Sequence, residues 1–234
     1  TGHDKEGRQK GNVMRDWQLF STTDMTHWTQ HPCPLTVFDF KWATSKQAYA
    51  GHVAKRNDKY YFYVSTNGSG IGVAVSDKIT GPYKDAIGKP LLTRQDCFDS
   101  KHGWCCIDSD IHRIAISTEH PFEEAPWLHK YQGRYYLTYA SGWPEKIAYA
   151  IADNVMGPYK TQGVISEIAG NSNTTHPAIV QYKGQWLFFS HNGGLPEGGS
   201  FSRSVVCEPL YNNADGSIRN IPPTTKGICG LFNK

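Results

Sequence analysis

The sequence lacks the long apolar run that a membrane-spanning helix needs, because no stretch approaches the roughly 18 consecutive apolar residues that cross a bilayer. Charge is also scarce and balanced: 19% of the 234 residues are charged and the formal net charge is +3. Proteins that bind nucleic acid or anionic membranes concentrate Lys and Arg in one segment or on one face, and no such basic run occurs here. The sequence therefore predicts neither a nucleic-acid nor a membrane partner, and it favours a neutral ligand.

Cysteine is too scattered for a disulfide framework. The chain has six Cys, and two of them are adjacent at Cys105 and Cys106, which predicts buried free thiols in a domain of this size. No cluster of His, Cys, Asp and Glu has zinc-site spacing, and no Gly-rich loop suits a phosphate. Thr1 to Asp4 lack the charged start and apolar segment of a signal peptide, so none is predicted.

Aromatic residues are the informative excess, with seven Trp, thirteen Tyr and ten Phe, many of them beside Gly or Pro. Aromatic rings pack against the flat C–H faces of sugars while polar groups bond the hydroxyls, which indicates a carbohydrate ligand. The alternative is that the rings fill the space between sheets, and this interpretation suits the Tyr-Tyr pairs within strands. Trp143, in a Gly-Trp-Pro turn, is the expected sugar-contacting exception.

A unit of short strands recurs along the chain. In the stretch Phe122 to Lys160, two carboxylates precede an Ala-Pro-Trp corner, three strands follow, and a Gly-Pro-Tyr turn closes the unit. The stretch from His52 to Lys84 repeats this order, and Ala178 to Gly193 repeats its first two strands. Recurring sheet-sized units predict an all-β protein, specifically a β-propeller, with a β-sandwich as the alternative.

The chain is expected to form one domain over residues 1–234, since all-β folds of this size are commonly undivided. Asp58 and Gly133 hold matching turn positions. A propeller blade takes roughly 40 to 50 residues. The interval between Asp58 and Gly133 is therefore longer than one blade and shorter than two. Part of a blade is therefore predicted to be missing between about Asp108 and Glu119, and the first blade is expected to be incomplete.

Several segments together carry a resemblance to a known family. The pieces are TGHDKE, MRDWQLFSTTDMTHWTQH, AYAGHVAKRNDKYYFYV, IGVAVSDKITGPYKDAIGKPL, EEAPWLHKYQGRYYLTYAS, IAYAIADNVMGPYK, NTTHPAIVQYKGQWLFFSHNG and FSRSVVCEPLYNNADGSI. In this order they resemble glycoside hydrolase family 43, in particular its arabinoxylan arabinofuranohydrolases and β-xylosidases. The resemblance implies a five-bladed β-propeller that releases terminal or side-chain pentose, α-L-arabinofuranose foremost and β-D-xylose next, by inversion.

Inverting hydrolysis needs a protonated carboxylic acid at the leaving oxygen and a carboxylate about 6.5 to 9.5 Å away that activates water. The resemblance assigns the general acid to Glu124 of the Glu-Ala-Pro-Trp motif, with Glu123 as the rival. It places at Asp108 the carboxylate that raises the pKa of the acid, although Ser109 stands where the family has Pro. The family's general base, an Asp, would lie upstream of Thr1, and Asp4 does not match it.

Two functions remain open at this point. Either the chain is a pentose-releasing glycosidase, with weak hydrolysis by these residues alone because loss of a base typically costs about a hundredfold to ten-thousandfold in rate, or it is a catalytically silent carbohydrate-binding propeller. The resemblance further implies substrate contacts by Arg203, Trp143 and Tyr49.

The resemblance also implies that His176 faces a cation through water, with a structural calcium ion in the central channel and no cofactor required for the chemistry. A polysaccharide substrate favours a secreted or periplasmic location over a cytoplasmic one. The partner is expected to be a pentose-containing oligo- or polysaccharide. The sequence makes no prediction of the oligomeric state.

Overall fold

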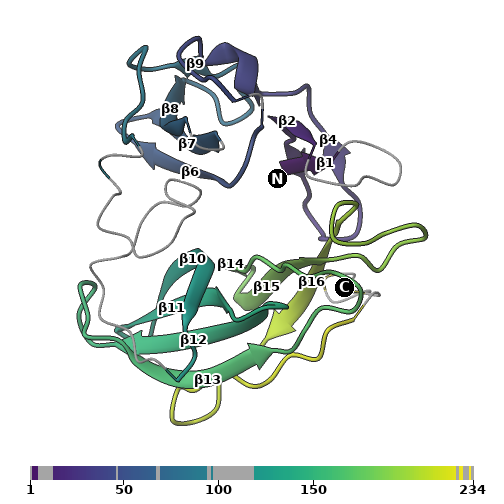
Figure 1. Ribbon diagram of the computed structural model, residues 1–234. Coiled ribbons are helices and arrows are strands. Elements are labelled where there is room, and N and C mark those ends of the chain that lie inside the picture. The colour runs from purple at the N-terminus through teal and green to yellow at the C-terminus, as the bar shows by residue number, and fades with distance from the viewer. Residues whose placement is uncertain are drawn as a thin grey trace. The chain divides into compact units, whose positions relative to one another are not determined.

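The structure, a computed structural model, describes residues 2–4, 13–45, 47–66, 69–93, 96, 119–224, 227–228 and 232. Over these residues the regular secondary structure is almost entirely β-strand, and the only helix found there is one 3-10 turn, η1 (Val37–Asp39) (Figure 1). No helical segment in this part of the chain has the length and apolar character that a membrane crossing requires. The predicted all-β class is confirmed.

The strands form five antiparallel sheets within the described ranges. In chain order they are β1 (Gly2–Asp4), β2 (Met14–Trp17), β3 (Phe20–Ser21), β4 (Thr29–Gln30), β5 (Leu35–Thr36), β6 (Gly51–Arg56), β7 (Lys59–Thr66), β8 (Gly70–Ser76), β9 (Lys84–Asp85), β10 (Phe122–Tyr131), β11 (Arg134–Ser141), β12 (Lys146–Ala152), β13 (Lys160–Ser166), β14 (Ala178–Tyr182), β15 (Gln185–Asn192) and β16 (Ser204–Leu210). The sheets have the orders β1-β2-β5, β3-β4, β6-β7-β8-β9, β10-β11-β12-β13 and β14-β15-β16. In the last three, each strand pairs with its neighbour in sequence, as propeller blades do.

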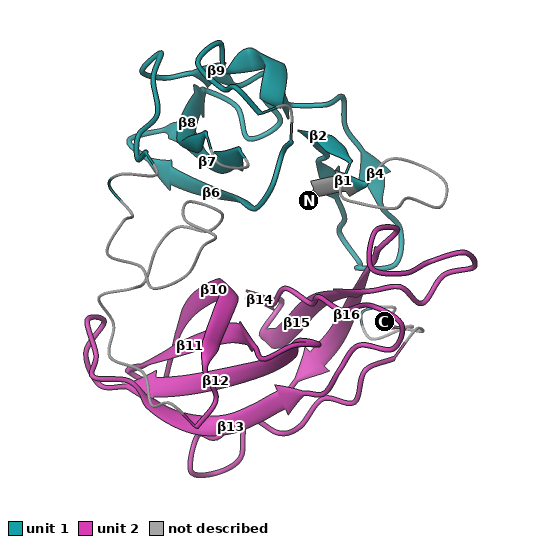
Figure 2. Cartoon of the chain, viewed as in Figure 1, with its two compact units in different colours: residues 1–5, 11–110, 232–234 teal, residues 6–10, 111–231 magenta. Residues whose placement is uncertain are grey.

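Contacts divide the chain into two compact units, residues 1–5, 11–110 and 232–234, and residues 6–10 and 111–231 (Figure 2). The first unit contains β1 to β9 and the second contains β10 to β16. The single domain expected from the sequence stays a prediction. The blade expected to be incomplete between Asp108 and Glu119 falls almost wholly outside the described residues.

The repeated units share one hairpin geometry. β6 and β7 are joined by Asn57-Asp58, β10 and β11 by Gln132-Gly133, and β14 and β15 by Lys183-Gly184. All six turn residues have positive φ. Two-residue turns with both φ positive match the right-handed twist of paired strands. The turn positions aligned from the sequence are therefore equivalent in structure.

The Gly-Pro-Tyr endings are equivalent as well. Tyr83 and Tyr159 are both buried, and each hydroxyl donates to the carbonyl oxygen four residues earlier, at 3.0 Å to Ile79 and 2.9 Å to Val155. The preceding glycines have φ of +78° and +85°, a region that disfavours residues with a side chain. The motif thus closes the turn after the third strand of each full repeat.

Free cysteines are confirmed at the two positions that the described residues include, Cys33 and Cys207. Their predicted burial is wrong for Cys33, which is exposed. It lies in the connection between β4 and β5, where its thiol donates to the carbonyl oxygen of Leu35 at 3.4 Å.

A core of apolar side chains joins the two sheets of the second unit. It is built around Tyr136 of β11, Ile147 of β12 and Phe188 of β15, all of which are almost fully buried. Burying one large apolar side chain contributes about 1.5–3 kcal/mol. The hydroxyl of Tyr136 donates to the carbonyl oxygen of Gly216 at 2.8 Å, which fastens the segment after β16 to the same core.

Candidate active site

Glu124 lies where β10 is irregular. The pairing of β10 with β11 shifts between Phe122 and Glu124 and again between Glu124 and Trp127. Ala125 has φ of +57°, and Pro126 has no backbone N–H for the strand pairing. Bulges bend a strand and redirect a side chain, often beside active sites. The sequence predicted a corner ahead of the strand here; the motif is instead a bulged part of the strand itself.

Trp127 fixes this segment to the neighbouring sheet. Its indole N–H donates to the carbonyl oxygen of Ile179 in β14 at 2.9 Å, and its ring packs against the core around Tyr136. The carbonyl oxygen of Trp127 accepts a bond from the hydroxyl of Thr138 at 3.2 Å. Because the bulge is held from both sides, Glu124 is presented from a fixed backbone.

Glu145 lies at the end of the turn that follows β11. Its backbone N–H donates to the carbonyl oxygen of Asn173 at 2.9 Å, and its Oε2 accepts a bond from the N–H of Thr175 at 2.7 Å. The residue is 1% exposed. Its Oε1 has no hydrogen-bond partner among the described residues. A carboxyl group buried in this way is expected to be paired or protonated.

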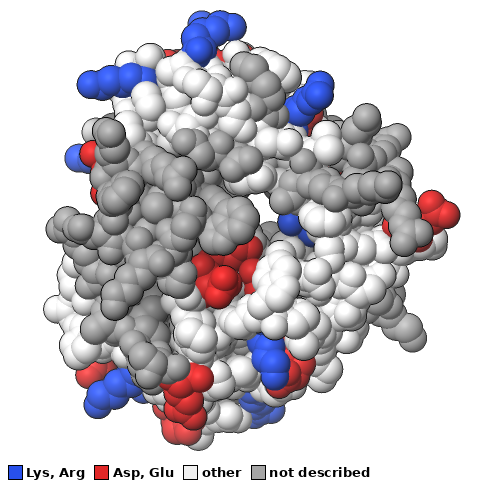
Figure 3. Space-filling model, viewed as in Figure 1, with Lys and Arg blue, Asp and Glu red and all other residues white. Residues whose placement is uncertain are grey.

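His176 connects to Glu124 from the segment before β14. Its Nε2 lies 2.9 Å from Oε1 of Glu124, and one nitrogen or oxygen of Glu124, Glu145 and His176 each lies within 4.8 Å of the others. The ring of His176 packs on that of His191 in β15 with centroids 5.1 Å apart. We call Glu124, Glu145 and His176 the carboxyl cluster. Figure 3 shows acidic atoms gathered on the face of the molecule over the region of β10.

The two carboxyl groups have opposite pKa shifts. Burial raises the pKa of Glu124, but the hydrogen bond and charge of His176, the contact with Glu145 and the charge of Arg203 outweigh burial and lower it to about 2. Burial, followed by the nearby charge of Glu124, raises the pKa of Glu145 to about 9. Two carboxyl groups so close do not both ionise readily. The raised pKa of Glu145 favours the form of the pair in which one of the two groups is protonated.

His191 stays uncharged beside this cluster. Burial, with smaller contributions from the charges of His176 and Arg203, lowers its pKa well below the ordinary value. Its Nε2 lies 3.2 Å from the hydroxyl oxygen of Thr174. The neutral ring thus supports His176 without adding a second positive charge near Glu124.

The other residues singled out from the sequence have different surroundings. Arg203 is half-buried in the segment before β16, and its positive charge lowers the pKa of Glu124. Trp143 is 66% exposed and lies two residues before Glu145 in the same turn. Tyr49 belongs to the first unit, where its ring packs against the core around Trp17. Asp108 lies outside the described residues.

The carboxyl cluster does not fit a calcium ion by itself. Calcium takes six to eight oxygen ligands, whereas these side chains offer two carboxyl groups and one imidazole. One oxygen of Glu145 is bonded to the N–H of Thr175, and Nε2 of His176 is bonded to Glu124. Neither His176 nor the two glutamates is therefore assigned as a metal ligand.

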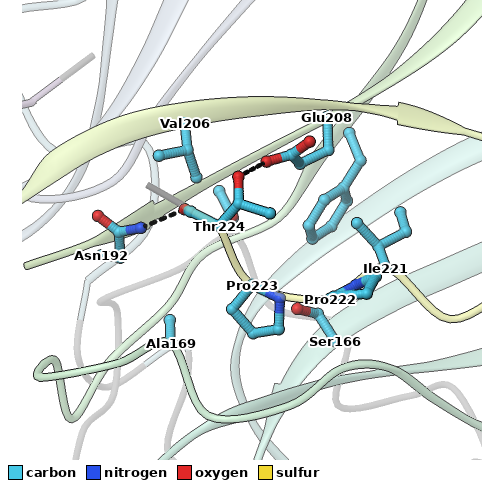
Figure 4. A pocket seen from close by; sticks show the side chains of 11 residues that line it. Ser166, Ala169, Asn192, Val206, Glu208, Ile221, Pro222, Pro223 and Thr224 are labelled. Carbon is cyan, nitrogen blue, oxygen red and sulfur yellow. Dashed lines mark hydrogen bonds between the residues drawn. The ribbon is translucent and has the colours of Figure 1, made fainter. Parts of the chain in front are cut away.

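A separate small cavity lies in the second unit, lined by residues such as Asn192, Glu208 and Thr224 (Figure 4). The amide of Asn192 donates to the carbonyl oxygen of Thr224 at 3.0 Å, and the hydroxyl of Thr224 donates to Glu208. Its volume of about 10 Å³ suits one water molecule and is too small for a sugar. None of the predicted site residues lines it.

Comparison with known proteins identifies the chain. The model of the family "Glycosyl hydrolases family 43" matches residues 9–106 and 107–218. The chain belongs to glycosyl hydrolases family 43. A xylosidase/arabinosidase of Bacteroides ovatus is 29% identical over 276 positions, covering 89% of this chain and 84% of the relative. An arabinoxylan arabinofuranohydrolase of Paenibacillus polymyxa is 26% identical over 99% of this chain and 48% of its own.

A solved family 43 structure is similar over nearly the whole chain. It is a β-xylosidase/α-arabinofuranosidase from a compost microbial metagenome, in complex with xylotriose and in a calcium-free form. It has a TM-score of 0.78 and 26% identity, and the match covers 96% of this chain and 90% of that chain. The predicted five-bladed β-propeller fold is thereby confirmed, and the protein is a glycoside hydrolase.

Sequence reasoning missed the most buried member of the carboxyl cluster. Glu145 follows Trp143-Pro144 in what reads as an ordinary polar turn, and His191 reads as a strand residue. The available signal was position: an acidic residue immediately before the apolar strand Lys146–Ala152, in a unit whose first strand carries Glu124. His176 was singled out, but as a residue near a cation and not as the partner of Glu124.

Proposed function

We propose that this family 43 enzyme releases terminal or side-chain pentose from arabinoxylan or its oligosaccharides with inversion, acting foremost on α-L-arabinofuranose and next on β-D-xylose. The observation that carries the proposal is the partly exposed carboxyl group of Glu124, bonded to His176 and backed by buried Glu145. The names of the relatives support the substrate class, since both describe xylose- or arabinose-releasing enzymes.

Glu124 is the proposed general acid. Its side chain is 26% exposed, so it can reach a leaving oxygen, whereas Glu145 is enclosed. Glu123, the rival from the sequence, is exposed and is not part of the carboxyl cluster. A general acid must start protonated, and a proton held between Glu124 and Glu145 would meet this requirement.

Glu145 is not the general base. Inverting enzymes keep about 6.5 to 9.5 Å between acid and base to admit a water molecule, but oxygens of Glu145 and Glu124 lie within 4.8 Å. A residue that is 1% exposed also has no room for that water. The base is proposed to be a further carboxylate across the sugar from Glu124, as the family resemblance implies.

The remaining roles follow from charge and exposure. Arg203 is proposed to hold a sugar hydroxyl beside the acid, because its charge already acts on Glu124. Trp143 is proposed to contact the sugar, because its ring is exposed in the turn that also contains Glu145. Tyr49 is proposed to line the pocket. No metal ion is assigned a step in the reaction, and the calcium ion of the central channel stays a prediction. A secreted or periplasmic location is proposed because it suits a polysaccharide substrate.

The first experiment compares the protein with Glu124→Gln and with the matched control Glu123→Gln. Release of pentose is measured from xylobiose and from arabinoxylo-oligosaccharides. Removal of the general acid should lower kcat by about a hundredfold or more, and Glu123→Gln should change it less than twofold. Equal activity in all three proteins would overturn the assignment of Glu124.

Azide tests whether the same proteins contain a general base. Azide attacks the anomeric carbon in place of activated water, the bond to the leaving oxygen breaks, and Glu124 protonates that oxygen. If the parent protein hydrolyses xylobiose weakly, added azide should yield the xylosyl azide of inverted configuration, and Glu124→Gln should yield far less. A parent protein that binds the sugars but gives neither product would establish the silent carbohydrate-binding alternative.

A further inference from the structure

Glu145 has the geometry of a buried hydrogen-bond donor, although glutamate is ordinarily an acceptor. Its Oε2 already accepts the N–H of Thr175, and its Oε1 has no hydrogen-bond partner among the described residues. One carboxyl oxygen of Glu145 lies within 4.8 Å of one of Glu124. Two ionised carboxylates only repel each other, whereas one proton between them makes a strong charge-assisted bond. Protonated Oε1 would satisfy both groups.

We propose that Glu145 is a positioning residue for the general acid, and that it shares one proton with Glu124 so that the proton is available at neutral pH. This rests on the proposed function of Glu124. The role is the one that the family resemblance gave to Asp108, and here it would come from the turn between β11 and β12. Glu145 does not touch the sugar, since it is 1% exposed.

The proton balance is simple. Before reaction the pair holds one proton and one negative charge. As the glycosidic bond breaks, the proton passes from Glu145 to Glu124 and from Glu124 to the leaving oxygen, and both carboxyl groups are briefly ionised. The proton released by the attacking water goes to the general base, and the pair regains its proton from solvent through the partly exposed carboxyl group of Glu124.

The charged and titratable groups around the pair act in opposite directions. His176 and Arg203 favour the ionised form of Glu124, which on its own would leave the acid without a proton at neutral pH. The contact with Glu145 also lowers the pKa of Glu124, whereas burial and the charge of Glu124 raise the pKa of Glu145, so the shared proton is stored on Glu145. His191, packed on His176, is held neutral by burial. Without a carboxyl group at position 145, the site would therefore lose its stored proton at lower pH.

The variant Glu145→Gln removes the proton of Glu145 while keeping the packing of its side chain. The amide has nearly the same shape, can accept the N–H of Thr175 and can donate to Glu124, but it cannot supply a proton or a negative charge. The basic limb of the kcat–pH profile should move down by about one unit or more. At neutral pH kcat on xylobiose should fall about tenfold or more, with KM nearly unchanged.

The leaving group and two further variants separate this role from a structural one. The decrease in kcat caused by Glu145→Gln should be much smaller with 4-nitrophenyl β-D-xyloside than with xylobiose, because the nitrophenolate leaving group needs little protonation. Glu145→Asp keeps a carboxyl group and should partly restore the basic limb. Glu167→Gln removes an exposed carboxylate paired with Lys146 at 2.7 Å, and it should change neither kcat nor the basic limb of the pH profile. An equal loss on both substrates with an unmoved pH profile would overturn the proposal.

Thermal unfolding tests the shared proton even if no hydrolysis is detected. The raised pKa of Glu145 stabilises the fold below the ordinary glutamate pKa, and this contribution is lost as pH rises toward about 9. The Tm of Glu145→Gln should therefore rise relative to the parent between pH 5 and pH 9. A difference in Tm that is constant with pH, or that appears only with added calcium and vanishes with EDTA, would refute proton sharing whatever the activity shows.

Discussion

At the scale of single residues, one turn holds two side chains with opposite exposure. Trp143 is 66% exposed while Glu145 is 1% exposed, and only Pro144 separates them. The exposed ring is free to contact a ligand, and the buried carboxyl group is free to act on Glu124. The turn between β11 and β12 thus serves both binding and proton transfer in the proposed reaction.

Replacement of Trp143 tests the binding half of this arrangement. Trp143→Ala should raise KM for xylo-oligosaccharides about threefold to tenfold, since an aromatic contact is worth about 0.5–1.5 kcal/mol, with a smaller change in kcat. Initial-rate kinetics on xylobiose and xylotriose measure this. The matched control is Trp28→Ala, a 46% exposed ring in the first unit. An effect of equal size in both variants would show that Trp143 is not a substrate contact.

At the scale of elements, the repeated unit was well predicted because its signals are local. Two-residue turns with positive φ and the Gly-Pro-Tyr endings depend on a few adjacent residues, so the sequence specifies them directly. The bulged part of β10 ends at Trp127, whose indole N–H bonds Ile179, 52 residues away. No local pattern announces such a contact, and this is why a corner was expected where the strand continues.

The buried Glu145 escaped prediction for a related reason. Its burial comes from Asn173 and Thr175, which approach it from a distant part of the chain. A carboxylate after Trp-Pro reads as a solvated turn residue because nothing nearby in sequence encloses it. Glu124 was found because its motif belongs to the family. His176 was predicted to face a cation, which stays a prediction, and its bond to Glu124 was not foreseen.

The two Gly-Pro-Tyr endings should contribute equally to the free energy of unfolding. Tyr83→Phe and Tyr159→Phe each remove one hydroxyl that donates to a carbonyl oxygen four residues earlier, so each should lower the free energy of unfolding by about 1 kcal/mol. Urea unfolding measures both. Tyr211→Phe, at a 47% exposed position, should have almost no effect. A large loss in only one variant would contradict the equivalence of the two turns.

At the scale of the whole molecule, stability has opposing pH dependences. Burial lowers the pKa of His129 to about 4, where the ring stacks on Tyr136 with centroids 5.1 Å apart. A group with a lowered histidine pKa is stabilising above the ordinary value near 6.5, and this is lost as pH falls toward 4. Glu145 behaves in the opposite sense, losing its contribution as pH rises toward about 9.

His129→Phe should therefore reduce the sensitivity to acid. Phenylalanine keeps the aromatic contacts with Tyr136 and Trp186 and cannot be protonated. Between pH 6.5 and pH 4 the parent should lose about 2 kcal/mol more than the variant, because one pKa unit corresponds to about 1.4 kcal/mol. Thermal unfolding across this range measures the difference. Parallel curves would mean that the imidazole accepts a proton in the folded state without cost.

The hairpin turns also indicate where the enzyme can be attached to a support. In β10, Glu124 stands near the beginning and the tip Gln132-Gly133 follows the last residue, so the two are separated by most of the strand. The space beside Gly133 and Gly184 is open, although their φ of +83° and +81° disfavours a side chain at these two positions themselves. A linker peptide inserted at either tip would anchor the catalyst to a solid support through the end of its strand opposite to the acid, leaving polymeric feedstock free to approach.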